Sequence, residues 1–180
     1  QFIEKVGLNT FAVALKATNQ FVELKIGKED GQYVIKNSEE EKDKMKYIFY
    51  AGKVSDPELR DIYRLIYNSE FDKLPLSCNK LKKQLLKEYG EDQNLHGKII
   101  KVFLTTRSGA EGVDLKHIRQ IHIMEPYWQP VLIKQIIGRG VRFESHIRLP
   151  ESERNVSVFI YLATITDKQL KTISSGAIRQ

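Results

Sequence analysis

The eight residues from Gln135 to Arg142, Gln-Ile-Ile-Gly-Arg-Gly-Val-Arg, limit what this chain can be more than any other stretch. Apolar side chains recur at helical spacing at positions 133, 136, 137 and 141, which predicts an amphipathic helix with one face on a core. Arg139 and Arg142 are three residues apart and would lie one turn apart on another face. Two neighbouring guanidinium groups suit an anion with several oxygens, because each offers a rigid fork of donors. Gly138 leaves room for a ligand or another backbone to approach.

A second stretch, from Thr105 to Leu115, is rich in glycine. It follows residues 98–104, an apolar and β-branched run of strand length, and Gly109 and Gly112 then interrupt the pattern. Doubly wound sheets bind their ligands at the carboxyl ends of their strands. We therefore expect this loop to lie at the working edge of a sheet.

In their order along the chain and in their residues, the two stretches resemble motifs V and VI of superfamily 2 helicases. Motif VI has the form Gln/His-x-x-Gly-Arg-x-x-Arg, which residues 135–142 meet at every fixed position. Motif V ends in Gly-x-Asp, which is matched by Gly112 and Asp114, and the link 122–130 resembles that of the Swi2/Snf2 branch. The chain resembles in particular helicases of large cytoplasmic DNA viruses, of the poxvirus and African swine fever virus type. These also carry a Ser-His pair after motif VI, matched here by Ser145 and His146.

The resemblance implies a nucleotide site. Arg139 and Arg142 would stabilise charge on the γ-phosphate oxygens during phosphoryl transfer; the alternative is that both pair with carboxylates of this lobe. Asp114, next to Gly112, would accept a hydrogen bond from a ribose hydroxyl, unless it is an ordinary loop aspartate that caps a turn. Gln135, with Gly138 in the same motif, would orient the nucleotide or tie two lobes together.

The same resemblance implies a nucleic-acid contact. Thr106 and Gly109 would hold a backbone phosphate, although a threonine at a strand end also occurs without such a role. Lysines at positions 80, 82, 83 and 87 form either a rail for phosphates or a solvated helix face, and we favour the solvated face. Trp128 could stack on a base, but its proline-flanked context favours packing in the core.

Two signatures of a complete motor are missing from these 180 residues. The sequence has no Gly-x-x-x-x-Gly-Lys-Ser/Thr loop and no Asp-Glu pair after a strand. Related helicases keep both in their first RecA-like lobe, so ATP with Mg²⁺ would be held mainly by an N-terminal lobe of the same protein. No spacing of residues predicts a metal site in this chain. We expect the chain alone to be inactive, and an NTP hydrolase only as part of a larger protein.

Net charge and hydropathy limit the kinds of binding partner that this chain can have. The formal charge of +6 and pI near 9.3 permit a polyanionic partner without requiring one. No apolar run approaches membrane-spanning length, so no membrane association is expected. The resemblance favours DNA over RNA, a contact with viral transcription machinery, and a location in the cytoplasm of an infected host cell, at the viral factory, and in the virion.

Periodicity predicts alternating strands and helices and therefore an α/β fold, which the resemblance specifies as RecA-like: a doubly wound, mainly parallel sheet with helices on both faces. Strands are expected at 21–26, 33–35, 47–50, 98–104, 120–124 and 156–162, the last of them central. Helices are expected to start after the capping residues Asn9, Ser55, Ser77 and Thr166, besides the motif VI helix.

We expect residues 1–164 to form the helicase C-terminal lobe, with insertions within about 20–46 and 68–97. Residues 165–180 would form a C-terminal helix that leads into a further region. The chain begins at Gln1 without a methionine, so we expect a fragment whose first strand is missing or clipped.

Three functions remain open at this stage. The first is the second motor lobe of an ATP-dependent helicase or translocase, which supplies motif V and the motif VI arginine finger to an ATP site shared with an absent N-terminal lobe. The second is an ATP-driven viral transcription initiation or termination factor that translocates without unwinding. The third is a non-catalytic nucleic-acid-binding module that kept the RecA-like fold.

Overall fold

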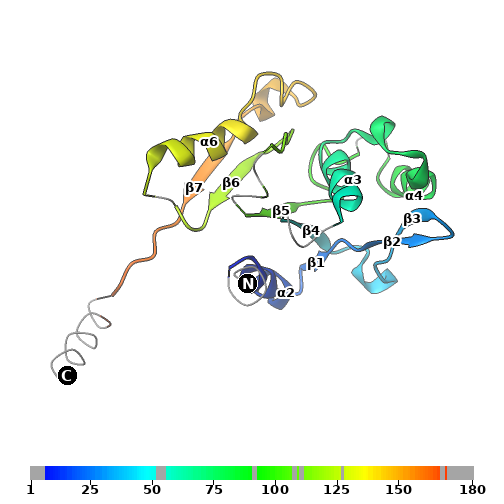
Figure 1. Ribbon diagram of the computed structural model, residues 1–180, viewed down its shortest axis with the longest axis horizontal. Coiled ribbons are helices and arrows are strands. Elements are labelled where there is room, and N and C mark those ends of the chain that lie inside the picture. Colours follow the sequence, from blue (N-terminus) through cyan, green and yellow to red (C-terminus); the bar gives the residue numbers. More distant parts are fainter. Residues whose placement is uncertain are drawn as a thin grey trace.

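The computed structural model describes residues 7–51, 56–90, 93–106, 109, 112–126, 128–166 and 169, in which groups of strands are interspersed with helices (Figure 1). The helices are α2 (Leu8–Ala17), α3 (Pro57–Tyr67), α4 (Asn79–Tyr89) and α6 (Pro130–Gly140). The strands are β1 (Phe21–Glu23), β2 (Ile26–Glu29), β3 (Gln32–Ile35), β4 (Met45–Tyr50), β5 (Val102–Thr105), β6 (Gln120–Ile123) and β7 (Ser157–Ile160). Short 3-10 helices cover Glu39–Glu41, Phe71–Lys73, Leu76–Cys78 and Glu151–Glu153.

Parallel pairing dominates the sheets. Strands β1, β4 and β5 form a three-stranded parallel sheet with β4 in the centre, and β6 pairs in parallel with β7. Strands β2 and β3 form an antiparallel hairpin. Asp30 and Gly31 turn that hairpin at φ +49° and +74°, because a two-residue hairpin turn of this kind needs left-handed backbone. The predicted α/β class with mainly parallel strands is confirmed.

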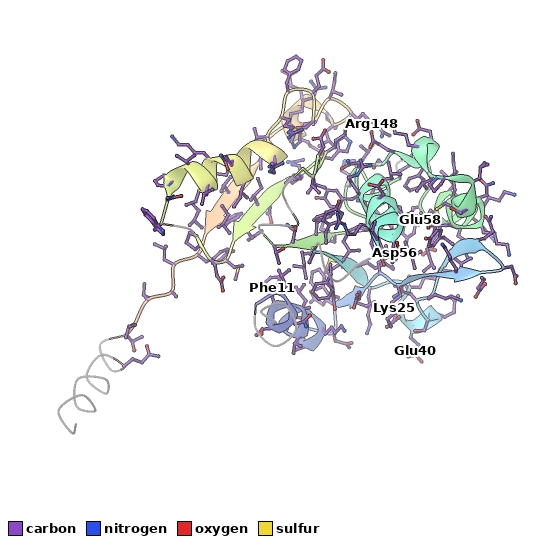
Figure 2. The ribbon with its side chains drawn as sticks, in the orientation of Figure 1. Phe11, Lys25, Glu40, Asp56, Glu58 and Arg148 are labelled. Atoms are coloured by element: carbon purple, nitrogen blue, oxygen red, sulfur yellow. The ribbon has the colours of Figure 1, made fainter. Side chains whose placement is uncertain are left out.

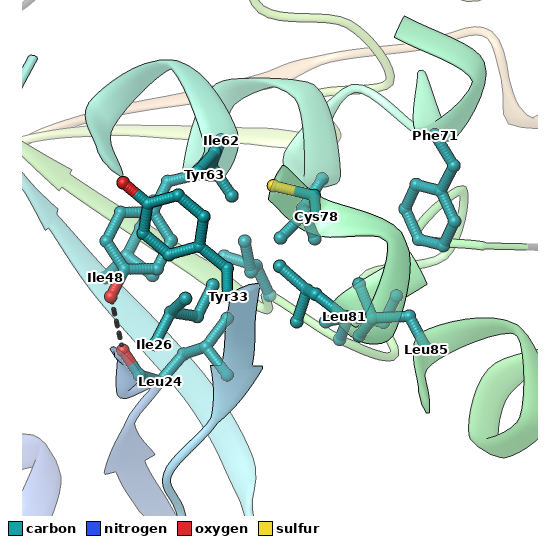
Figure 3. Close-up of a cluster of buried hydrophobic side chains, with 13 residues drawn as sticks. Leu24, Ile26, Tyr33, Ile48, Ile62, Tyr63, Phe71, Cys78, Leu81 and Leu85 are labelled. Atoms are coloured by element: carbon teal, nitrogen blue, oxygen red, sulfur yellow. Dashed lines mark hydrogen bonds between the residues drawn. The ribbon is translucent and has the colours of Figure 1, made fainter. Parts of the chain in front are cut away.

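Helices cover both faces of the three-stranded sheet. Side chains of α3 and α4 pack with Ile48 of β4 in the larger core, which also contains Leu24 and Tyr63 (Figure 3). Helix α2 packs through Ala12 against Tyr47 on the opposite face. The Tyr63 hydroxyl donates to the Leu24 carbonyl at 2.9 Å, and burial raises the pKa of Tyr63 to about 12. The larger core thereby anchors α3, whose carboxyl end leads to the site.

The structure corrects several predicted helix starts. Helix α2 begins after Gly7, so Asn9 lies inside the helix and is not its cap. Asp56 caps α3 by accepting from the Glu58 amide at 3.0 Å (both residues are labelled in Figure 2), whereas Ser55 lies outside the described residues. Helix α4 starts after Cys78, because Ser77 belongs to a preceding 3-10 turn. The order of these three helices is as predicted, but the strand predicted at 21–26 is divided into β1 and β2, which belong to different sheets.

Two predictions of burial in the C-terminal half are wrong. Strand β7, predicted as central, pairs with β6 and has mostly exposed side chains among the described residues. On that open face, His122 stacks on Phe159 with ring centroids 4.8 Å apart. Trp128, predicted to pack in the core, is 82% exposed. Helix α6 begins only at Pro130, so Trp128 lies before the helix and is not part of the helix face that packs on β6.

The lysine-rich helix α4 has a solvated outer face. It buries Leu81 and Leu85 in the larger core, and the four lysines surround that buried stripe. Lys80 lies 3.8 Å from Asp30, and both side chains are exposed. Helix α4 lies at the opposite end of the molecule from α6 (Figure 1). Among the helices that the structure describes, none has the length and apolar character to cross a membrane.

Candidate functional site

The motif VI helix forms as predicted but ends before its last arginine. Helix α6 ends at Gly140, and Val141 is its C-cap, so Arg142 lies beyond the helix. The expectation that Arg139 and Arg142 lie one turn apart on the same helix is therefore wrong. Arg139 is half-buried in the last turn, and Gln135 is exposed on α6.

Glycines in α6 have two different surroundings. A Cβ at Gly140 would lie 2.9 Å from the Ile121 side chain and 3.0 Å from that of Ile118, so this glycine allows α6 to pack closely on β6. A Cβ at Gly138 would meet nothing within 4 Å among the described residues. Packing among the described residues therefore explains why position 140 needs glycine, but it does not explain the glycine at position 138.

Motifs V and VI meet through their side chains. An Arg142 guanidinium nitrogen lies 3.0 Å from Asp114 Oδ1, and the two side chains are 45% and 51% exposed. The expected alternative, an arginine paired with a carboxylate of the same lobe, thus applies to Arg142. An exposed ion pair contributes only about 0–1 kcal/mol, so a stronger anionic partner can take the guanidinium from it.

The motif V loop closes tightly onto the end of β4. Thr105 Oγ1 donates to the Tyr50 carbonyl at 2.8 Å, and the Gly109 amide donates to Thr106 Oγ1 at 3.2 Å. A Cβ at Gly109 would overlap the Tyr50 carbonyl oxygen and lie 2.8 Å from Thr105 Oγ1. Gly112 has φ +78°, a left-handed conformation that favours glycine. Positions 107, 108, 110 and 111 are outside the described residues.

The Ser-His pair after motif VI holds the turn that follows Arg142. Ser145 Oγ lies 2.8 Å from the Arg142 carbonyl and 2.8 Å from His146 Nδ1. His146 Nε2 lies 2.6 Å from the Ile118 carbonyl, and since a carbonyl only accepts, Nε2 carries a proton. The His117 amide donates to the Ser145 carbonyl at 3.0 Å. The Ser-His pair thus connects the backbone of Arg142 to that of Ile118 through hydrogen bonds.

Asn68 belongs to no motif in the sequence, yet its side chain reaches motif V. Its carboxamide is hydrogen-bonded to the backbone of Asp114 and Lys116. The contacts span 46 and 48 residues of the chain. No local pattern in the sequence could signal them; only the packing of α3 beside the motif V loop shows them.

His117, next to this turn, has a strongly shifted pKa. It is 7% exposed, and its ring nitrogens have no hydrogen-bond partner among the described residues. Burial lowers the pKa of His117 to about 4, and the positive charges of Arg148, His146 and Lys116 act in the same direction. Glu70 opposes them weakly. His117 is therefore neutral when the protein is folded at neutral pH.

This shift predicts a loss of stability in mild acid. The pKa of about 4 in the folded chain lies below the ordinary 6.5, so the unfolded chain takes up the proton first. Stability should fall as the pH drops from about 6.5 to 4, by about 3 kcal/mol from this group. His117→Asn, which tolerates the local φ of +60°, should flatten this dependence in urea unfolding measured between pH 7.5 and 4.5.

The control for this prediction is His96→Gln. His96 is 44% exposed at the side chain and lies 3.2 Å from Glu153, so its substitution controls for the loss of one histidine from the chain. Equal slopes for the wild type and His117→Asn would show that His117 does not titrate between these limits.

Comparison with known proteins identifies the family. The model of the Helicase conserved C-terminal domain matches residues 29–144. The termination factor NPH-I homolog of African swine fever virus is 34% identical over 122 residues, which are 66% of this chain and 17% of that protein. Nucleoside triphosphatase I of Melanoplus sanguinipes entomopoxvirus is 34% identical over 110 residues, 61% of this chain and 17% of that protein.

A third relative, R350 of Acanthamoeba polyphaga mimivirus, has the words RNA helicase in its name. It is 49% identical over 73 residues, 41% of this chain and 9% of that protein. The chain thus spans a small part of the curated relatives that it matches. No solved structure is significantly similar to it. The matched residues include both motif V and motif VI, and the chain belongs to the helicase conserved C-terminal domain family, with its RecA-like α/β fold and its relatives among large DNA viruses.

Proposed function

We propose that this chain is the second motor lobe of an ATP-dependent nucleic-acid helicase or translocase. It would supply motif V and the motif VI arginines to an ATP site shared with an N-terminal lobe. The observation that carries this proposal is the pairing of Arg142 with Asp114, which places an arginine and a carboxylate from the two motifs at one exposed position. Relatives named as nucleoside triphosphatase and termination factor support ATP use and action on nucleic acid.

The nucleotide would contact residues of both motifs. Arg142, and Arg139 in the last turn of α6, would face the γ-phosphate, where charge develops in the transition state. Asp114, released from Arg142, would accept from the ribose, with Gly112 shaping the loop. Gln135 and Gly138 would lie along the approaching nucleotide or first lobe, and the open space at Gly138 fits such an approach. Mg²⁺ would be held by the first lobe, since the described residues offer no ligand cluster.

Nucleic acid would contact the loop after β5. The Thr106 side chain is half-exposed and could offer its hydroxyl to a phosphate, whereas Gly109 is buried and would contribute through the shape of the backbone. We favour DNA over RNA. The host-cell cytoplasm and viral transcription machinery remain the proposed setting, because the relatives come from large DNA viruses.

A second candidate keeps the ATPase and drops unwinding. One relative is named a termination factor, so a motor that moves on duplex nucleic acid without separating its strands is the alternative. Strand displacement by the complete two-lobe protein separates the two candidates. A helicase releases the labelled strand when ATP is added, whereas a translocase hydrolyses ATP and leaves the duplex intact.

The proposal predicts that residues 1–180 alone show no ATPase above buffer. Joined to the first lobe, the chain should give turnover that nucleic acid stimulates. Phosphate release is measured for the fragment, for the two-lobe protein and for the fragment with Arg142→Ala. If the fragment shows activity and Arg142→Ala leaves it unchanged, that activity comes from a contaminating ATPase. Robust turnover by the fragment that Arg142→Ala abolishes would contradict the two-lobe proposal.

A further inference from the structure

We propose that Asn68 is a positioning residue for the ATP site: its buried carboxamide holds the motif V backbone so that Asp114 meets Arg142. This inference rests on the proposed function of those two residues. Asn68 itself would touch neither nucleotide nor nucleic acid, because it is 1% exposed.

The carboxamide of Asn68 fits the motif V backbone on both of its sides. Nδ2 donates to the Asp114 carbonyl at 2.9 Å, and Oδ1 accepts from the Lys116 amide at 2.8 Å. The two backbone groups dictate this orientation, because a carbonyl only accepts and an amide N–H only donates. One buried side chain thus fixes the chain on either side of Leu115. Satisfied buried hydrogen bonds of this kind resist displacement, since breaking one leaves a polar group unpaired.

The turn that carries Asn68 is itself held firmly. Asn68 is the C-cap of α3, and Ser69 follows with φ +56°, a left-handed conformation that is unusual for serine. Ser69 Oγ accepts from the Asn94 amide at 2.9 Å, and its carbonyl accepts from Arg148, labelled in Figure 2, at 2.7 Å. A strained residue persists only where its surroundings over-determine it. Asn68 is therefore a rigid support and not a flexible loop residue.

The next residue, Glu70, adds a second connection to the motif V segment. Its carboxylate lies 3.0 Å from the Lys116 ammonium and 2.7 Å from that of Lys73. Burial alone would raise the pKa of Glu70, but hydrogen bonds from Lys73 and Lys116 outweigh it and lower the pKa. Glu70 is thus ionised when it pairs with Lys116, and the turn after α3 contacts both the backbone and the side chain of that residue.

The support at Asn68 matters because the functional side chains are loosely held. Asp114 and Arg142 are about half-exposed, so their positions depend on the backbones that carry them. Ser145 holds the Arg142 backbone, because its hydroxyl donates a hydrogen bond to the Arg142 carbonyl at 2.8 Å. Asn68 performs the corresponding task for Asp114. A misplacement of about 1 Å in an active site can reduce turnover on the order of 10²-fold.

A purely structural role for Asn68 is the competing explanation, and Asn94 provides the matched control. Asn94 is 2% exposed, and its Oδ1 accepts from the amides of Ile99 and Ile100 at 2.9 and 2.8 Å. Its Nδ2 donates to the Tyr67 carbonyl at 3.1 Å. The side chain of Asn94 therefore has the same chemistry and burial as that of Asn68 but holds residues outside motifs V and VI, and Asn94→Ala keeps the backbone amide that donates to Ser69.

The test compares Asn68→Ala and Asn94→Ala in the complete two-lobe protein, with melting curves of each. Both should lower the melting temperature. At a temperature where both variants are folded, Asn68→Ala should reduce kcat for ATP by roughly ten- to a hundredfold with little change in KM. Asn94→Ala should keep kcat within about twofold of the wild type, because it leaves the motif V backbone in place.

Asn68→Asp keeps the side-chain volume and the hydrogen bond from the Lys116 amide, but it loses the N–H that donates to the Asp114 carbonyl. This variant is used if Asn68→Ala does not fold. A normal kcat in a folded Asn68 variant, or equal losses for Asn68→Ala and Asn94→Ala, would overturn the positioning role. Arg142→Ala distinguishes a failure of the proposed function from a failure of the role of Asn68. If it too keeps normal turnover, the proposed function fails; if it abolishes turnover while Asn68 variants do not reduce it, only this inference fails.

Discussion

Arg142→Ala should reduce ATP turnover of the two-lobe protein by roughly 10³–10⁵ while leaving the melting temperature of the lobe little changed. Arg142 lies beyond the end of α6, and its side chain is 45% exposed. Its pair with Asp114 is an exposed one, which contributes about 1 kcal/mol at most. The loss should therefore appear in kcat, where a guanidinium stabilises charge on the transferred phosphoryl group. Nucleotide binding should suffer less, because the first lobe would hold most of the triphosphate.

Two further variants sharpen this experiment. Arg142→Lys should rescue turnover poorly, since a point charge cannot reproduce a planar fork of donors. Arg119→Ala is the matched control, because Arg119 is 39% exposed and forms a comparable pair with Glu153 at 3.2 Å, away from Asp114. Steady-state ATPase and melting curves give the answer. Near-normal turnover in a folded Arg142→Ala protein would remove the arginine finger and leave motif VI as a structural helix.

Gly109→Ala should destabilise the lobe by about 3 kcal/mol. The added Cβ would overlap the Tyr50 carbonyl oxygen, which is backbone in the central strand β4 and cannot rotate away. Either β4 or the motif V loop must shift, and a shift of the loop also moves Asp114. Urea unfolding of the lobe measures the loss. A stability equal to that of the wild type would show that the loop does not pack on β4 in solution.

Gly138→Ala provides the contrast, because a Cβ there meets nothing within 4 Å among the described residues. Alanine in an exposed helix interior is more stable than glycine by roughly 0.5–1 kcal/mol, so this lobe should become slightly more stable. If nucleotide or the first lobe approaches α6 closely, turnover of the two-lobe protein should nevertheless fall. Unchanged turnover would remove Gly138 from the proposed nucleotide site.

Local physics explains why the sequence predicted the elements of this fold well. The apolar spacing at positions 133, 136 and 137 predicted α6, which the structure has at Pro130–Gly140. The strand expected at 33–35 lies within β3. Each of these features depends on residues within a few positions of one another. The motif V and VI residues were identified in the same way, from their order in the chain.

The exact ends of elements and the exposure of single side chains required the tertiary structure. The apolar period continues to Val141, yet α6 ends at Gly140, where the chain turns and Ser145 bonds back to the Arg142 carbonyl. Trp128 is exposed, as are Gln129, Pro130 and Val131 after it, at the start of α6. Periodicity describes a face of a helix; it does not specify where the next segment packs.

The sequence by itself determined which residues this lobe offers for chemistry, because the motifs are contiguous and their spacing is visible in the chain. Only the tertiary structure decided that Arg142 pairs with Asp114 and that Asn68 holds the Asp114 backbone. The Asn68 contact joins positions 46 residues apart. A contact over such a distance exists only when the helix α3 and the motif V loop pack side by side, and that packing is a property of the whole core and not of any local pattern.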